Sequence, residues 1–224
     1  MPGKAKGSRF LAVMGDLVAS EAAASRAELH QNFNTAVSAV NAQFAVNLES
    51  PLTITLGDEF QGLTRTGLEA FRIVLALRLK LLRNKVLCRF VIGPVDLATP
   101  VNPDRAWNMM GEGLAQARER LDDKKDANAY RFSFYQDKPL SRLLDAVGHS
   151  LTLIEEDWTE TQRLYVLAHI LDGADVAEIA EQHRVSERAV YKVLSAARLS
   201  FYQDQIEAVL GFLESRDAML TGGE

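Results

Sequence analysis

The first half of the chain alternates between strand-like and helix-like apolar patterns. Residues 10–14 form an unbroken apolar run, as in a strand buried on both faces. Residues 52–63 contain two apolar runs separated by Gly57-Asp58-Glu59, which is typical of two strands joined by a tight turn. Between these segments, Ser25 and Glu28 have the spacing of a capping box, and apolar residues recur at helical intervals up to about Asn47.

The same reasoning predicts a second helix over residues 68–82 and a strand over residues 86–93. The resulting order of strand, helix, strand, strand, helix, strand is that of a split βαβ sheet. A further helix is expected over residues 107–121, and aromatic residues alternate with polar ones over residues 129–135, as in an edge strand. The expected fold is therefore α+β, with a ferredoxin-like sheet.

From residue 158 onward the pattern is helical throughout. Helices are expected over residues 162–171, 176–183, 186–199 and 203–214, and a short turn separates the second from the third. That spacing is typical of a helix-turn-helix. Charge also changes near this point, from about +3 over the first 150 residues to about −8 over the rest. We expect a sheet domain over residues 1–137, a linking helix over 138–157 and a small all-α helix-turn-helix domain over 158–224.

Composition excludes several classes of protein. With Cys88 as its single cysteine, the chain forms no intrachain disulfide, and a cysteine-based zinc site is implausible. No apolar run is long enough for a membrane span, and the basic start leads into no signal-peptide pattern. A net charge of −5 gives no global reason to expect nucleic acid as a partner. We expect a cytoplasmic protein without a membrane partner.

Three acidic residues are the candidate chemistry of the sheet domain. Asp16 ends the first strand, and Asp58 and Glu59 lie in the hairpin turn. In a split βαβ sheet the first strand lies beside that hairpin, so the carboxylates can converge. Carboxylates suit Mg²⁺ or Mn²⁺, with phosphate oxygens completing the shell. The alternatives are a solvated acidic hairpin tip and an Asp16 that caps a turn. Residues 17–20, which are Leu17, Val18, Ala19 and Ser20, lead into a helix and could present amide groups to the phosphates.

Three segments together resemble the SatD family. They are Met14-Gly15-Asp16-Leu17-Val18-Ala19-Ser20, Gly57-Asp58-Glu59-Phe60-Gln61-Gly62 and Arg89-Phe90-Val91-Ile92-Gly93, followed by a helix with Gly111 and Ala117-Arg118-Glu119. The resemblance covers most of the first 135 residues and implies little about mechanism.

The same segments are more distantly similar to class III nucleotidyl cyclases and GGDEF-type diguanylate cyclases. The resemblance implies a nucleotidyl-cyclase-like palm that binds a nucleoside triphosphate, with Asp16 and Asp58 as metal ligands and Glu59 as an auxiliary acid. It also implies that Leu17 to Ser20 face the phosphates. Several positions depart from the cyclase pattern. The position of a base-selecting Lys is Ile54, and Ala115 and Glu119 stand where a cyclase has its transition-state Asn and Arg.

Arg118 and Arg120 lie one residue to either side of Glu119, and helix geometry turns each about 100° away from it. Arg118 is the candidate substitute for the missing catalytic arginine. Binding of a ligand is better supported than cyclisation, and whether the chain is a cyclase or a nucleotidyltransferase stays open.

The tail resembles the LuxR and sigma-region-four type of helix-turn-helix, through Thr159-Glu160-Thr161-Gln162, Ile179-Ala180, Val185-Ser186 and Ala189-Val190. Its candidate DNA-binding residues are Arg184, Ser186, Arg188 and Lys192. The acidic charge of the tail opposes DNA contact, and a docking or dimerising module is the alternative.

Two functions are therefore expected. The first is a metal-dependent nucleotide-binding domain coupled to a helix-turn-helix output domain. The second is a DNA-binding transcriptional regulator whose palm domain is a non-catalytic sensor or scaffold. A homodimer is expected by analogy with palm-type cyclases.

Overall fold

A computed structural model describes residues 9–18 and 25–221 of the chain. Its strands are β1 (Arg9–Leu17), β2 (Leu48–Leu56), β3 (Glu59–Thr64), β4 (Cys88–Leu97), β5 (Gly111–Glu112) and β6 (Tyr130–Phe132). Its helices are α1 (Arg26–Gln43), α2 (Gly67–Arg83), α3 (Leu114–Asp122), α4 (Lys138–Asp157), α5 (Glu160–Leu171), α6 (Val176–His183), α7 (Glu187–Ala196) and α8 (Leu199–Thr221). The fold is thus mixed α+β, as expected.

The sheet places β1 at its centre. The strand order is β2-β3-β1-β4-β5, and β6 pairs with β4. All pairings are antiparallel except that of β4 with β6. The predicted order of the first six elements is confirmed, and so is the predicted adjacency of β1 and the β2–β3 hairpin. Residues near the end of β1 therefore have neighbours on two strands.

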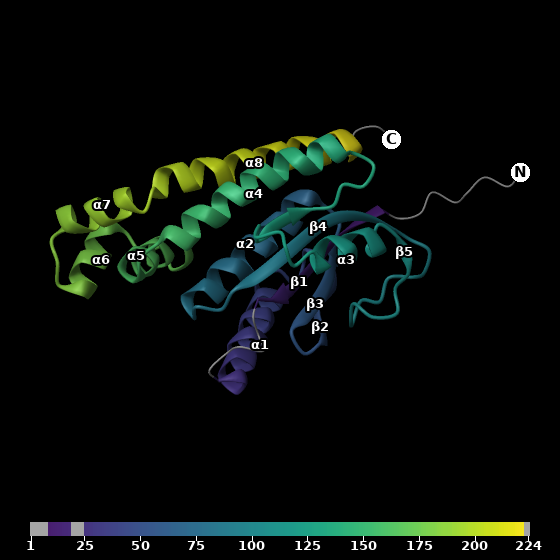
Figure 1. The fold of residues 1–224 in the computed structure, drawn as a ribbon, viewed down its shortest axis with the longest axis horizontal. Coiled ribbons are helices and arrows are strands. Elements are labelled where there is room, and N and C mark those ends of the chain that lie inside the picture. Colours follow the sequence, from purple (N-terminus) through teal and green to yellow (C-terminus); the bar gives the residue numbers. More distant parts are fainter. Residues whose placement is uncertain (1–8, 19–24, 222–224) are drawn as a thin grey trace, which may run out of the picture.

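Helices cover both faces of this sheet (Figure 1). On one face, Leu11 and Val13 of β1 belong to the large core formed with α1 and α2. On the other face, Ala12 and Met14 pack against Ala117 of α3 in a smaller core. Because side chains alternate along a strand, Asp16 follows Met14 onto the α3 face. The position of Asp16 thus follows from the same alternation that builds the two cores.

Local signals fix the hairpin and the first helices. Gly57 adopts a φ of 60°, which a glycine reaches without strain, so β2 and β3 are joined by a two-residue turn of Gly57 and Asp58. The Ser25 side chain accepts a hydrogen bond from the Glu28 amide at 3.2 Å, which confirms the predicted cap of α1. The Thr66 hydroxyl similarly caps α2.

The helix predicted over residues 107–121 is shorter than expected, because α3 begins only at Leu114. Gly113 has a φ of 93°, which a right-handed helix cannot contain, and Gly111 lies so close to the backbone of Asp96 that a Cβ would stand 2.2 Å from its carbonyl oxygen. Gly111 instead joins the short strand β5. The final helix differs in the opposite direction, since α8 runs from Leu199 to Thr221 rather than over residues 203–214.

Helices α4 and α8 lie side by side along α2, and α5, α6 and α7 gather at one end of this pair (Figure 1). The large core is continuous from the sheet into these helices and includes Trp158, Tyr165 and Tyr202. The Asp217 carboxylate of α8 accepts from the amides of Gly67 and Leu68 at the start of α2. The division at residues 137 and 157 stays a prediction. None of the described helices is long and apolar enough to cross a membrane.

Candidate functional site

Asp16 is the centre of the candidate site. On neighbouring strands its direct register partners are Glu59 of β3 and Arg89 of β4. Directly opposed residues of antiparallel strands project to the same face, so all three side chains lie on the α3 face of the sheet. Asp16 is 3% exposed and Arg89 is 9% exposed, so this carboxylate and this guanidinium are removed from water together.

Two cations hold the Asp16 carboxylate. Arg89 Nε lies 2.9 Å from Oδ1, and Lys124 Nζ lies 2.5 Å from Oδ2. Neither Asp16 Oδ1 nor Arg89 Nε takes part in an aligned hydrogen bond, although they form a close ion pair. The Lys124 side chain, in contrast, is 60% exposed. We call Asp16, Arg89 and Lys124 the Asp16 cluster.

The backbone of the hairpin residues Asp58 and Glu59 lies beside the end of β1. Glu59 opposes Asp16 across the β1–β3 pair, and the Asp58 carbonyl oxygen accepts from the Leu17 amide at 3.0 Å. Both hairpin residues are half-buried. These three residues therefore lie at the same end of the sheet, while the convergence of their carboxylates and their chemical roles stay predictions.

Arg118 also lies near this face. It donates to Gln61 Oε1 at 3.2 Å, and Gln61 is the next residue after Glu59 on the same face of β3. Arg120 is held elsewhere, because it forms ion pairs with Asp126 at 2.9 Å and Asp145 at 2.8 Å. Of the two arginines flanking Glu119, Arg118 is thus the one directed to the sheet end.

The predicted phosphate-facing turn is only partly described. The Leu17 amide donates to the Asp58 carbonyl, and the Val18 amide donates to Leu87 O at 2.8 Å. These two amides are already used in strand pairing and are not directed to a ligand. Ala19 and Ser20 lie outside the described residues.

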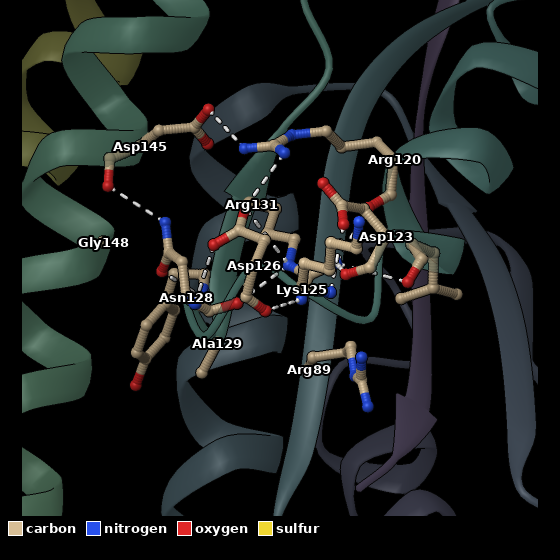
Figure 2. Close-up of polar contacts among 12 residues, drawn as sticks. Arg89, Arg120, Asp123, Lys125, Asp126, Asn128, Ala129, Arg131, Asp145 and Gly148 are labelled. Atoms are coloured by element: carbon tan, nitrogen blue, oxygen red, sulfur yellow. Dashed lines mark hydrogen bonds and ion pairs between the residues drawn. The ribbon is translucent and has the colours of Figure 1, made fainter.

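Arg131 organises the loop that carries Lys124. This residue of β6 is 1% exposed, and its guanidinium donates to carbonyl oxygens around the end of α3. Figure 2 shows these groups around Arg131; the acceptors are Arg120 O, Leu121 O, Asp123 O, Asp126 O and Asn128 O. Because the last carbonyl groups of a helix lack intrahelical partners, this one cation closes α3 and fixes the following loop. Burial lowers the pKa of Arg131 from its usual value.

A hollow of about 190 Å³ lies beside the Asp16 cluster. Its charged lining residues are Arg78, Arg89, Lys124, Arg131, Asp126 and Glu156. Four of these six are basic, so the hollow favours an anion. Arg89, Lys124 and Arg131 were not predicted as site residues. The available signal was a basic residue within each of the apolar strand patterns at 86–93 and 129–135, because a charge there is retained only with a partner.

A second buried cluster links the hollow to the tail. Arg78 Nε lies 2.7 Å from Glu155 Oε2, and the hydroxyls of Tyr130 and Tyr202 donate to Glu155 Oε1 at 2.5 and 2.7 Å. We call these four residues the Glu155 cluster. Burial opposes the charge of Arg78, but the Glu155 carboxylate outweighs it and raises the pKa of Arg78. The cluster joins α2, β6, α4 and α8.

The arrangement does not fit a preformed magnesium or manganese site. Both oxygens of Asp16 already face cations. Among the residues that the structure describes, no group of three or more His, Cys, Asp or Glu side chains is placed to hold a metal ion. The predicted ligand role of Asp16, Asp58 and Glu59 therefore has no support in this geometry.

The tail exposes the residues predicted to contact DNA. Arg184 adopts a left-handed conformation with a φ of 54° between α6 and α7, and Ser186 caps α7 by accepting from the Ala189 amide at 3.3 Å. Arg188 and Lys192 are exposed on α7, whereas Val190 and Leu194 are buried. The side chains of Arg188 and Lys192 thus project away from the core.

Comparison with known proteins assigns the family. The structure defines a mixed α+β protein with a mostly antiparallel sheet. The SatD family model matches residues 10–207, and the chain belongs to the SatD family. No curated protein matches it significantly.

Solved structures give more distant similarities. A bacterial light-regulated adenylyl cyclase matches with a TM-score of 0.41 and 14% identity, over 56% of this chain and 75% of that chain. The catalytic core of a rhodopsin-guanylyl cyclase with converted specificity, in complex with ATPαS, matches with a TM-score of 0.38 and 14% identity, over 58% of this chain and 80% of that chain. Likenesses this distant carry no functional argument.

Proposed function

We propose that the chain binds a nucleotide through its phosphate groups at the end of β1, and that the helical tail responds to this binding. The observation that carries the proposal is the basic hollow beside the buried Asp16 cluster. The proposal concerns binding and includes no reaction.

The charge of the hollow supports a phosphate-bearing ligand. Guanidinium and ammonium groups are the side chains that bind phosphate oxygens most strongly. Arg89 and Lys124 come from β4 and from the loop after α3, so a ligand between them would contact two separate segments. The similarity of the Gly15-Asp16 and Gly57-Asp58 segments to nucleotidyl cyclases supports a nucleotide as the source of the phosphates.

The Glu155 cluster supports a response of the tail. Arg78 lines the hollow and pairs with Glu155 of α4, which in turn accepts from Tyr202 of α8. A ligand that changes the environment of Arg78 therefore acts on a hydrogen-bonded path to α8. Such a path biases an equilibrium only if the tail has two arrangements with different ligand affinity.

Thermal stability in the presence of ligands tests the proposal. Nucleoside triphosphates should raise Tm, by an amount that corresponds to about 2.7 kcal/mol at 100 times Kd, whereas the matching nucleosides should not. Arg89→Gln should abolish the shift. Arg72→Gln is the matched control, because Arg72 is an exposed α2 residue that pairs only with Glu69 of its own helix among the ion pairs of the described chain. If none of the common nucleoside triphosphates raises Tm, the proposal is wrong.

DNA binding by the tail is a second candidate function. The exposed face of α7 favours it, since Arg188, Tyr191 and Lys192 lie there without covering residues. In a helix-turn-helix this second helix would enter the major groove. Arg184 and Ser186, which are also predicted to contact DNA, would lie at the start of this helix.

Fluorescence anisotropy with duplex DNA at several salt concentrations tests this candidate. The double variant Arg188→Ala/Lys192→Ala should reduce the slope of log K against log salt by about 2, because two phosphate contacts are lost. Lys138→Ala at the start of α4 serves as a charge control outside α7. Absence of DNA affinity at low salt would leave a docking or dimerising role for the tail.

A further inference from the structure

We propose that the site at the end of β1 holds its anion without a divalent metal, and that the anion takes Lys124 from Asp16. Arg89 and Lys124 supply the positive charge that a metal would supply, and Asp16 is their counter-ion in the absence of ligand. This inference rests on the proposed function and specifies how the site retains its ligand.

Arg89 is the fixed part of this arrangement. It lies near one end of the pairing between β4 and β1, directly opposite Asp16, and its side chain is 11% exposed. Strand pairing fixes its backbone, and burial limits the movement of its guanidinium. Its Nε is buried and faces Asp16 Oδ1 at 2.9 Å without the alignment of a hydrogen bond.

The fixed position of Arg89 opposes a metal at Asp16. Magnesium binds carboxylate oxygens at about 2.1 Å, so an ion on Oδ1 would stand within roughly 5 Å of Arg89 Nε. At that separation like charges repel strongly in a partly buried site. The second oxygen, Oδ2, is covered by Lys124. A metal ion would therefore have to displace Lys124 from Oδ2 or stand close to Arg89 on Oδ1.

Lys124 is the exchangeable part. Its side chain is 60% exposed, and it follows α3 in a loop whose backbone is held by Arg131. The loop therefore stays in place while the flexible lysine stem changes partner. An anion in the hollow would compete with Asp16 Oδ2 for the ammonium group at little structural cost.

The hollow suits a polyphosphate group better than a carboxylate. Two cations share the single charge of Asp16, and Arg131 adds positive charge to the same lining, whereas the charge of Arg78 is already paired with Glu155. A phosphate group offers several strong acceptor oxygens in a compact shape, so it can meet Arg89 and Lys124 at once. The volume of about 190 Å³ leaves room for more than one phosphate group.

The binding of inorganic triphosphate to the full-length chain tests the inference. Isothermal titration calorimetry is carried out once with EDTA and once with Mg²⁺ or Mn²⁺. Binding should be at least as tight in EDTA as with metal, because the site needs no ion and the metal withdraws free triphosphate. Lys124→Gln should weaken the binding at least tenfold. Lys125→Gln, at the exposed neighbouring position, should change it less than twofold.

Asp16→Asn separates the two ways of using this carboxylate. If Asp16 were a metal ligand, the variant would lose binding. If Asp16 is the counter-ion, removing its charge leaves Arg89 and Lys124 to the anion, and binding in EDTA should be retained or become tighter. Circular dichroism and Tm of each variant confirm that it is folded before titration.

The outcomes distinguish this inference from the proposed function. Binding of triphosphate or nucleotide only in the presence of metal overturns the inference and leaves the proposed function standing, as does loss of binding in folded Asp16→Asn. Equal weakening in Lys124→Gln and Lys125→Gln also overturns it, since the effect would then be general electrostatics. Metal-free binding of triphosphate without binding of any nucleotide supports the inference and contradicts the proposed function. Absence of any anion binding contradicts both.

Discussion

The Glu155 cluster and the Asp16 cluster each contain a buried ion pair, and the two pairs are built differently. In the Glu155 cluster both side chains of the pair are at most 2% exposed, and every oxygen of Glu155 accepts a hydrogen bond. In the Asp16 cluster one cation is 60% exposed, and the contact between Asp16 Oδ1 and Arg89 Nε lacks hydrogen-bond alignment. The first cluster is closed, whereas the second retains an exchangeable partner.

The difference indicates a division of roles. A closed ion pair in a low-dielectric interior is costly to break, so the Glu155 cluster maintains the contact of α4 and α8 with α2 and β6. A pair with one solvated member exchanges partners more readily. The Asp16 cluster is therefore suited to ligand binding, and the Glu155 cluster to structural connection.

Loss of Glu155 should have the largest effect on stability. Glu155→Ala leaves the Arg78 charge buried without its carboxylate and removes the acceptor of two tyrosine hydroxyls, so we expect a loss of about 3–5 kcal/mol in the free energy of unfolding. Urea unfolding followed by circular dichroism measures it. Glu156→Ala, at the adjacent exposed position, should stay within about 0.5 kcal/mol. Similar losses in the two variants would remove the distinction between closed and open clusters.

The same change of charge should cost less in the Asp16 cluster. Asp16→Asn keeps the shape of the side chain, and the released Lys124 reaches solvent. We expect a loss of about 1–3 kcal/mol in the free energy of unfolding, because the buried Arg89 loses its counter-ion. Urea unfolding compares the free energy of unfolding of this variant with that of Glu155→Gln. Both variants exchange a carboxylate for an amide. A larger loss for Asp16→Asn would show that its cluster is the main structural one.

The sequence predicted one of these clusters only in part. Alternation along β1 and the glycine-containing turn placed Asp16 and the hairpin acids at one end of the sheet, because strand order follows from the succession of elements. Lys124, 108 residues from Asp16, becomes its partner only through the conformation of the loop held by Arg131. No periodic pattern encodes that conformation, so the cations remained unrecognised.

The Glu155 cluster was not predicted at all. Arg78 and Glu155 lie in helical segments where charged residues are ordinarily solvated. Their burial depends on how α4 and α8 pack against α2, which is a tertiary property. The late start of α3 has a more local cause, since Gly113 adopts a φ of 93°. The helix was predicted across Gly113 because the apolar residues on either side of this glycine recur at helical intervals.

Removal of a single hydroxyl should produce a smaller effect within the Glu155 cluster. Tyr202→Phe deletes one of the two hydroxyl donors to Glu155 Oε1 and leaves the other, from Tyr130. We expect a loss of about 1 kcal/mol in the free energy of unfolding, as for a typical buried hydrogen bond. Tyr191→Phe is the matched control, because Tyr191 is 59% exposed on α7. An unchanged stability in Tyr202→Phe would mean that this hydroxyl contributes nothing to the attachment of α8.

The last difference between the clusters concerns alkaline pH and should be invisible at neutral pH. Burial, together with the nearby Glu155 charge, raises the pKa values of Tyr130 and Tyr202 well above the usual value for tyrosine. The folded chain therefore holds these protons more tightly than the unfolded chain, whose tyrosines titrate near 10. Their contribution to stability is fully present below about pH 10 and is lost as pH rises beyond it. Absorbance at 295 nm should show that these two tyrosines ionise only when the chain unfolds. In Tyr202→Phe the unfolding step should carry one tyrosine fewer, and ionisation of both before unfolding would show that the Glu155 cluster is open to water.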